Sequence, residues 1–287
     1  MTLGVLTQTT LNGLTIGAIY ALLALGLTLL FGIMDILFFA HGALYMFGAY
    51  SAYYLVVKLG INYFLAALIT IGVIGLLGAI IERAVIRPVR GEEMVVFFVA
   101  ISLNWFLESS GFALFGIKPK CIQPIFHGKV TFWGASLSWE RIAVVLVGLA
   151  AILALYLFLT RTKWGLGMQA FSEDPEAAEL QGISNDFICR LGFFIGAGLA
   201  ALGGLLVASL YIITPTMGDH PLLIGMLIIA LGGLGSIPGA LIAALILGFI
   251  ESFGATFLGA SYTWGPMFIF CFIFLIIRPT GIMGVER

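Results

Sequence analysis

The most regular feature of the chain is a succession of apolar stretches of about 20 residues, which recur from one end to the other. Each stretch is long enough to cross a hydrocarbon core about 30 Å thick as a helix that rises 1.5 Å per residue. Because lipid offers no hydrogen-bond partner to the backbone, we interpret each stretch as a helix. We place these spans at roughly 8–31, 36–57, 63–86, 94–116, 141–160, 187–212, 221–235, 238–257 and 261–278.

Composition agrees with this pattern. Hydrophobic residues make up 61% of the 287 positions and charged residues only 9%, whereas a soluble domain carries about 25% charged residues. No polar segment is long enough to form a soluble domain between the spans. The sequence therefore predicts an all-α polytopic membrane protein with about eight or nine transmembrane helices, in which residues 1–287 form a single transmembrane domain.

The apolar run from 221 to 257 is broken by Gly232-Gly233-Leu234-Gly235-Ser236-Ile237-Pro238-Gly239. We expect two short helices that meet at this break. Irregular backbone at membrane depth is tolerated where it is buried in protein or lines a water-filled cavity, but not where it faces lipid. Gly235 and Pro238 are therefore candidates for a pathway through the membrane.

The distribution of lysine and arginine predicts the orientation of the chain. If the N-terminus is outside, eight of the 13 basic residues face the cytoplasm and five face outward. The cytoplasmic set is Arg83, Arg87, Arg90, Arg161, Lys163, Arg190, Arg278 and Arg287, and the outer set is Lys58, Lys118, Lys120, Lys129 and Arg141. This bias favours an external N-terminus and a cytoplasmic C-terminus, which requires an odd number of crossings.

The longest cytoplasmic loop, about 161–186, contains the signature of a short helix. Asp174 is a good N-cap, Pro175 suits the first helical position, and Glu176 lies near the positive end of the helix dipole. Gly182 can adopt the left-handed conformation that ends a helix. The sequence predicts about two helical turns capped at both ends, and Asp186 or Ser184 can cap the span that follows.

The loop that contains this helix has an acidic surface formed by Glu173, Asp174, Glu176, Glu179 and Asp186. Acidic residues are poor anchors for an anionic leaflet, so a protein partner is favoured over lipid. An ordinary amphipathic connector is equally compatible with the local sequence.

Polar residues inside the spans are expensive in lipid and are candidates for function. They are Asn12, His41, Asn104, Glu108 and Glu251, with Tyr45 as a further candidate at a glycine-rich end of a span. Asn104 and Glu108 are four residues apart and share one helix face. A backbone hydrogen bond and a proton relay are both open for His41, and Glu108 suits either a solvated pathway or a helix end.

Small residues recur every fourth position in the span after the cytoplasmic loop, at Gly192, Gly196, Ala200, Gly204 and Ala208. Such spacing lets two helix backbones approach closely. It predicts tight helix packing within a bundle or at a subunit interface.

Motifs that would indicate an enzyme are absent from the sequence. The chain has no phosphate-binding Gly-rich loop ending in Lys-Ser/Thr, no His-Glu-x-x-His and no Gly-x-Ser-x-Gly. Its three cysteines lie on distant segments, and its net charge of −1 favours no nucleic-acid partner. We expect no catalytic, cofactor or metal site in this chain.

Several segments match one family in order along the chain. They include Asn12-Gly13-Leu14-Thr15-Ile16-Gly17-Ala18-Ile19-Tyr20, Phe39-Ala40-His41-Gly42-Ala43-Leu44-Tyr45, Gly165-Leu166-Gly167-Met168-Gln169-Ala170 and the stretches 26–33, 82–91, 177–183, 232–240 and 278–281. Together they resemble the permeases of branched-chain amino acid ABC transporters of the high-affinity leucine/isoleucine/valine type. The chain resembles the shorter of the two permease types in that family.

The resemblance implies an importer in the bacterial inner membrane. It implies a second permease subunit that is a different polypeptide chain, two cytoplasmic ATPase subunits that use ATP, and a periplasmic or lipid-anchored binding protein. By the same likeness, the ATPase-coupling residues are Gly165, Gly167, Asp174, Pro175, Glu176, Ala177, Ala178, Glu179 and Gly182.

Branched-chain amino acids are the expected substrate, but other hypotheses remain open. Phe38 replaces an asparagine of the family pattern, and close relatives carry urea or short amides. A stand-alone channel or proton-coupled carrier using Glu108 and Glu251 is an alternative, as is a purely structural scaffold, although a scaffold needs no broken span.

Overall fold

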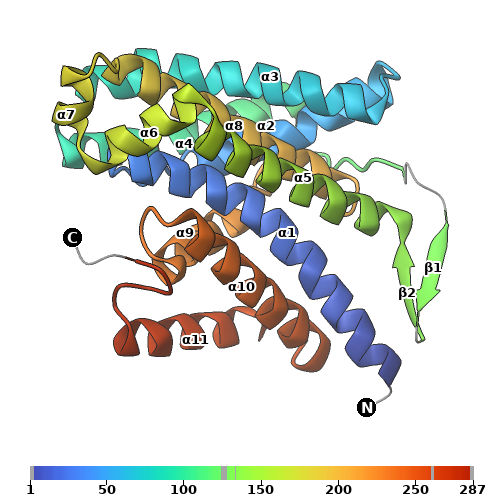
Figure 1. Cartoon of the computed structure of the whole chain (residues 1–287). Helices are drawn as coiled ribbons and strands as arrows, with labels where there is room; N and C mark the ends of the chain where they lie inside the picture. Colours follow the sequence, from blue (N-terminus) through green and yellow to red (C-terminus); the bar gives the residue numbers. More distant parts are fainter. Residues whose placement is uncertain (1–2, 124–127, 133, 260–261, 285–287) are drawn as a thin grey trace.

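The computed structural model describes residues 3–123, 128–132, 134–259 and 262–284. Helices dominate this part of the chain (Figure 1). The elements are α1 (Leu3–Met34), α2 (His41–Ala52), η1 (Tyr53–Lys58), α3 (Tyr63–Ile81), η2 (Glu82–Ile86), η3 (Arg87–Val89), α4 (Glu93–Phe115), β1 (Lys129–Phe132), β2 (Ala135–Ser138), α5 (Trp139–Arg161), α6 (Lys163–Glu173), α7 (Pro175–Leu180), α8 (Asn185–Ala208), α9 (Asp219–Gly232), α10 (Ile237–Phe257) and α11 (Trp264–Ile277).

Each predicted span coincides with an observed helix. Within the described residues, six helices are long and apolar enough to cross a membrane, and α9 and α11 are shorter apolar helices of 14 residues. The prediction of a helical, multi-pass membrane protein is therefore confirmed. The predicted span at 36–57 begins later than expected, at His41, and its last turns are the π-helix η1.

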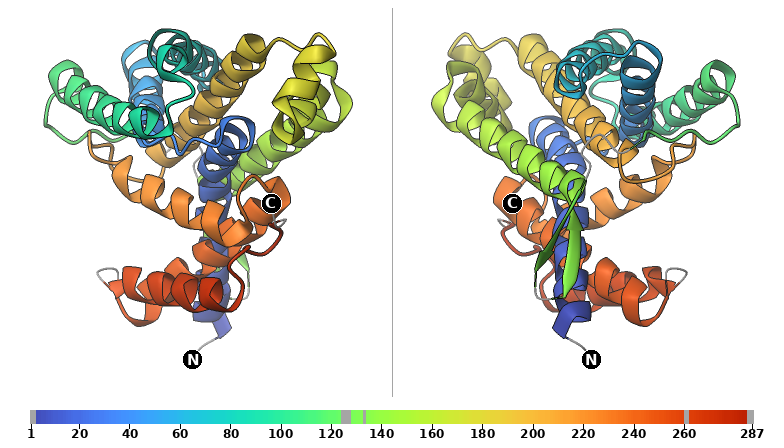
Figure 2. Two further views of the ribbon diagram at one scale, coloured as in Figure 1. Left: turned by 90° about the vertical axis from the view of Figure 1, so that its left-hand side faces the viewer. Right: turned by 90° about the vertical axis from the view of Figure 1, so that its right-hand side faces the viewer.

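Two groups of helices meet along α1. Figure 2 shows α2 to α5 and α8 on one side of α1, with α9 to α11 on the other. The most apolar windows of α1 and α8 are 83% buried, whereas those of α4 and α5 are 22% buried. Helices α1 and α8 thus form the interior of the bundle, and the apolar sides of α4 and α5 are left to face lipid.

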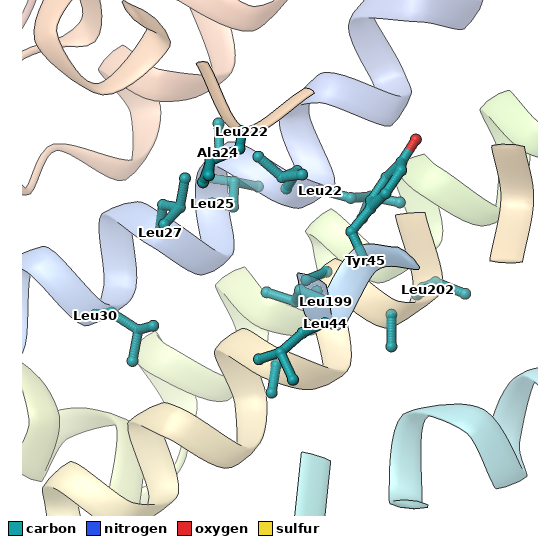
Figure 3. Packing of buried hydrophobic residues seen from close by; sticks show 14 of the residues in the cluster. Leu22, Ala24, Leu25, Leu27, Leu30, Leu44, Tyr45, Leu199, Leu202 and Leu222 are labelled. Carbon is teal, nitrogen blue, oxygen red and sulfur yellow. The ribbon is translucent and has the colours of Figure 1, made fainter. Parts of the chain in front are cut away.

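Close-packed leucines and glycines hold the interior together. Leucines of α1, α2 and α8 converge in one cluster, among them Leu22, Leu44 and Leu199 (Figure 3). A Cβ added at Gly204 would collide with the backbone carbonyl of Tyr45, and one added at Gly48 would collide with the backbone of Ala201. The small-residue stripe therefore packs α8 tightly against neighbouring helices of the same chain, as predicted.

The predicted break between two short helices is also confirmed. Helix α9 ends at Gly232, and the hydroxyl of Ser236 caps α10 by accepting a hydrogen bond from Gly239 N at 3.2 Å. Gly233 has a φ of +101°, which a residue with a side chain rarely adopts. The C-terminal segment returns to this break, where Ile282 N donates to Leu231 O at 2.8 Å.

Two features were not predicted from the sequence. Strands β1 and β2 form a small antiparallel hairpin at the end of the molecule where α1 begins (Figure 1). Helix α6 fills the loop before the predicted capped helix, although glycine disfavours helix by about 1 kcal/mol. Gly165 is needed because a Cβ there would collide with the Phe158 carbonyl of α5, so glycine permits the sharp turn between α5 and α6.

Candidate functional site

A cavity of about 240 Å³ lies within the helix bundle, between α1, α2, α9, α10 and the connection from α8 to α9. Since one water occupies about 30 Å³ of liquid, the cavity has the volume of roughly eight waters. Its polar lining consists of Tyr20, Tyr45, Tyr211, His220 and Glu251, and most of the remaining wall is aliphatic. Tyr211 and Ile212 are 51% and 63% exposed, so the cavity is open at these residues.

A tyrosine and a glutamate meet at the centre of the polar lining. The Tyr20 hydroxyl donates to Glu251 Oε2 at 2.5 Å, and it lies 3.5 Å from Nδ1 of His220. The rings of His220 and Trp264 pack edge to face, with ring centroids 4.4 Å apart. Three polar groups from α1, α9 and α10 therefore line one side of an otherwise apolar cavity.

Glycines explain why α1 and α10 meet so closely. A Cβ at Gly248 of α10 would lie 2.6 Å from the Cα of Gly17 on α1. Gly17 precedes Tyr20 by three positions, and Gly248 precedes Glu251 by three, so each glycine shares a helix face with its polar neighbour. The close contact of the two glycines brings the hydroxyl and the carboxylate within hydrogen-bonding distance.

Lys120 fastens the segment between α8 and α9, whose residues Tyr211 and Ile212 form the exposed wall of the cavity, called its outer wall below. Its backbone pairs with Ile213, with Lys120 N donating to Ile213 O at 3.0 Å and Ile213 N donating back at 2.8 Å. The Lys120 Nζ donates to the Tyr54 hydroxyl at 2.7 Å. It also lies 4.5 to 5.6 Å from the ring centroids of Tyr50, Tyr53, Tyr54 and Phe115, which we call the Lys120 cage.

At the opposite end of the molecule, α6 and α7 form a compact unit between α5 and α8 (Figure 1). The Asp174 carboxylate accepts from Ala177 N at 3.0 Å, Pro175 is the first residue of α7, and Gly182 has a φ of +82°. The predicted roles of Asp174 and Gly182 at the two ends of α7, and of Pro175 as its first residue, are confirmed. Ala178 is buried, whereas Glu176 and Glu179 are exposed and Leu180 is 87% exposed, so α7 has an outward face without a partner among the residues that the structure describes.

A cluster of charges joins the start of α8 to the segment that follows α3. Glu82 is fully buried, accepts from Arg90 and lies 3.8 Å from Nε of Arg190. Asp186 forms ion pairs with Arg87 and Arg90. Of the two residues expected to cap α8, Ser184 holds the N-cap position, although its side chain makes no capping hydrogen bond, and Asp186 is engaged by the arginines instead.

Of the residues predicted for the pathway, Tyr45 and Glu251 line the cavity. In Figure 3 the Tyr45 hydroxyl points away from the leucine cluster. Asn12 lies instead in the N-terminal part of α1, where its side-chain oxygen accepts from Arg141 and from Gln8 Nε2 at 3.2 Å. His41 is completely buried against Gly26, whose added Cβ would lie 2.7 Å from the His41 Nε2.

The other predicted pathway residues are not brought to this cavity. Asn104 and Glu108 lie on α4 and are partly exposed. Gly235 lines a smaller cavity of about 90 Å³ beside α6, and Pro238 is exposed in the first turn of α10. The 14 residues of α9 separate this break from the larger cavity by about 20 Å. A pathway role for these four residues stays a prediction.

Sequence reasoning missed Tyr20, Tyr211 and His220. Two signals in the sequence pointed to His220 and to Tyr20. Gly218-Asp219-His220 places two titratable residues directly before the predicted span at 221–235, and Tyr20 is a polar aromatic residue in the middle of an aliphatic span. Neither signal shows which helices would meet there.

Comparisons with known proteins agree with this architecture. The structure of PsaBC from Streptococcus pneumoniae in complex with Fab is similar in fold, with a TM-score of 0.51 and 16% identity over 94% of this chain and 91% of that chain. The chain is 35% identical to the high-affinity branched-chain amino acid transport system permease protein BraD of Pseudomonas aeruginosa, over 96% of this chain and 95% of BraD. It is 33% identical to the corresponding permease protein LivH of Escherichia coli, with the same coverage.

A weaker similarity links a part of the chain to another transport protein. The fructose import permease protein FrcC of Rhizobium meliloti is 29% identical over 46% of this chain and 39% of FrcC.

The profile of the branched-chain amino acid transport system permease component matches residues 9–277. The chain therefore belongs to the family of permease components of branched-chain amino acid transport systems.

Proposed function

We propose that the chain is the membrane-spanning permease of an ATP-driven importer, and that it translocates branched-chain amino acids delivered by an external binding protein. The observation that carries the substrate class is the cavity, which combines an aliphatic wall with one carboxylate. An amphiphilic solute with a branched apolar side chain fits such a lining better than urea, which has no apolar part.

The proposed assembly contains a second permease subunit from a different chain, two cytoplasmic ATPase subunits that hydrolyse ATP, and a periplasmic or lipid-anchored binding protein. Its location is the bacterial inner membrane, with the N-terminus outside and the C-terminus in the cytoplasm. In support, α6, α7 and the segment that follows α11 lie at one end of the molecule, while α1 begins at the other (Figure 1). Residues 1–287 act in this proposal as one transmembrane domain, with about 161–186 as its ATPase-coupling loop.

The coupling loop is built to carry motion into the membrane. Helix α6 packs on α5 and α8, and α7 packs on α6. Helix α8 follows directly and reaches the cavity at Val207, near its far end. A displacement of α7 by an ATPase would therefore be transmitted along α8 to the cavity wall, as rigid helices transmit motion between two states of a transporter.

The substrate is tested with the whole importer in proteoliposomes. ATP hydrolysis and solute uptake are measured with a panel of leucine, isoleucine, valine, urea and short amides. We expect the branched-chain amino acids to stimulate both activities. Stimulation by urea or amides alone would contradict the proposed substrate, and uptake by this chain without ATPases under a proton gradient would favour a carrier.

Coupling is tested by reversing charges on the outward face of α7. In Glu176→Lys combined with Glu179→Lys, or in Gly182→Pro, we expect ATP hydrolysis to continue while uptake falls, because the helix no longer fits its partner. The matched control is Glu92→Lys combined with Glu93→Lys, which reverses two exposed charges on another cytoplasmic loop. Equal uptake in the α7 variants and the control would contradict a coupling role.

A further inference from the structure

We propose that the Glu251 carboxylate binds the ammonium group of the solute as it passes through the cavity, which makes the cavity a transient selectivity site for amino acids over neutral amides. This inference rests on the proposed function and deepens it. It assigns to the permease a part of the selection that would otherwise be left to the binding protein.

The first step of the argument is that Glu251 lacks a cationic partner. A carboxylate can accept about four hydrogen bonds, and the Tyr20 hydroxyl supplies one of them. Ion pairs in the described part of the chain lie at the cytoplasmic end and do not include Glu251. Arg141, at the outer end of α5, donates instead to Asn12. A carboxylate within a membrane bundle is costly unless it is paired or solvated, so a transient cation in the cavity would stabilise it.

The second step is that the carboxylate is held ready for a ligand. Tyr20 is 5% exposed and is packed in the core, so its hydroxyl fixes one oxygen of Glu251. Glu251 itself is only partly buried and lines the cavity. The remaining acceptor positions of the carboxylate are therefore available to a donor that enters the cavity. Tyr20 acts here as a positioning residue.

The third step is that the rest of the wall matches the other end of an amphiphilic solute. Ile16, Ile19, Ile212 and Met217 line the cavity with the polar groups. A solute with an ammonium group and a branched side chain satisfies both parts at once. A neutral amide would leave the carboxylate without a cation.

A bare metal ion is the other source of positive charge. Metal ions such as Ca²⁺ take six to eight oxygen ligands, whereas this wall is mostly aliphatic. The ammonium group needs only a few acceptors, because it donates three hydrogen bonds. The geometry therefore favours ammonium, and the experiment separates the two sources.

The experiment compares Glu251→Gln with the wild type in the assembled importer. We expect leucine uptake to fall at least about tenfold, the loss expected for a charge-assisted hydrogen bond, while binding-protein-stimulated ATP hydrolysis stays within about twofold. Tyr20→Phe keeps the charge and should lower uptake only about threefold. Glu93→Gln removes an exposed charge outside the cavity and should change neither activity. Unchanged uptake in Glu251→Gln would overturn the inference.

A second measurement covers the case in which Glu251→Gln fails to assemble. In the intact complex, the variant Ile212→Cys places a thiol in the cavity wall. Cys121→Ser removes the exposed native thiol of this chain, and Cys189 and Cys271 are buried, so the introduced thiol is the accessible one among the described residues. We expect a cationic thiol reagent to react at least about threefold faster than an anionic one of equal size, and leucine to slow the cationic reaction. Equal rates would overturn the inference.

Two further outcomes keep the hypotheses apart. A wild-type complex that couples ATP hydrolysis to some other solute, and does not import leucine, contradicts the proposed substrate. Wild-type leucine uptake that requires sodium would assign the carboxylate to a metal ion and overturn this inference alone.

Discussion

The two ends of this membrane protein are held together by different interactions. At the end that we propose faces the cytoplasm, called the cytoplasmic end below, a buried glutamate, three arginines and Asp186 join the segment after α3 to the start of α8. At the opposite end, called the outer end below, the cation–π contacts of the Lys120 cage fasten the cavity wall. The hairpin is also attached there by a neutral hydrogen bond, in which Ser136 N donates to Gln8 Oε1 at 2.9 Å.

The difference is informative because the two kinds of interaction respond differently to displacement. Removing one member of a buried ion cluster leaves another charge without compensation, so the cytoplasmic end has few alternative arrangements. The attraction between a cation and several rings varies gradually with position, so the outer wall can shift without losing all of its contacts. A rigid cytoplasmic end suits the transmission of force, and an adjustable outer wall suits the entry of a solute.

The largest expected effect on stability follows from removing the buried carboxylate of Glu82. Glu82→Gln leaves Arg90 and Arg190 without their shared counter-charge and should destabilise the protein by about 3–5 kcal/mol. The measurement is thermal unfolding in detergent. Glu93→Gln, on an exposed site nearby, is the control and should change stability by less than about 0.5 kcal/mol. Similar unfolding of the two variants would remove the contrast between the ends.

Close helix packing towards the outer end gives the next effect. Gly204→Ala places a methyl group against the Tyr45 carbonyl and should destabilise the protein by about 1–3 kcal/mol. Gly72→Ala is the matched control, because a Cβ at Gly72 meets nothing within 4 Å and alanine favours the helix. We expect thermal unfolding of Gly72→Ala at or above the wild-type temperature. A Gly204→Ala protein as stable as this control would show that the two helices can separate freely.

These regions also differ in how far the sequence predicted them. The helix α7 was predicted in position and in its caps because Asp174, Pro175 and Gly182 act on their immediate neighbours. The spans were predicted because hydrophobic length alone determines a crossing. Local chemistry of this kind is visible in a single sequence.

The cavity could be predicted only in part, because it depends on contacts between distant residues. Tyr45 and Glu251 were chosen as polar residues within spans, but Tyr20 and Glu251 are 231 positions apart. Their meeting depends on the contact between Gly17 and Gly248, and many glycines in the chain could have formed such a contact. Asn12 was chosen by the same criterion and instead binds Arg141. Periodicity shows which residues share a helix face and does not show which helices pack together.

Loosening the Lys120 cage tests whether the outer wall is adjustable. Lys120→Met keeps an apolar stem but removes the charge, and should cost about 1–2 kcal/mol in thermal unfolding. We also expect faster thiol labelling of Ile212→Cys in this background, because Ile212 adjoins the residue that Lys120 pairs with. The exposed Lys118→Met is the control. Unchanged labelling would show that the backbone pairing with Ile213 suffices to fix the wall.

The smallest effect should be confined to the compact unit formed by α6 and α7. Asp174→Ala removes the side chain that accepts from Ala177 N and should destabilise α7 by about 1 kcal/mol. Because α7 can open without the rest of the protein, amide hydrogen exchange at Ala177 and the following residues should accelerate about fivefold while the thermal unfolding temperature stays nearly constant. Glu173→Ala changes the neighbouring acidic residue, which is not the cap, and should leave exchange unaltered. If Asp174→Ala instead lowered the unfolding temperature as Glu82→Gln does, α7 and the ion cluster would unfold as one unit, and the rigid end would extend to the surface that we propose meets the ATPase.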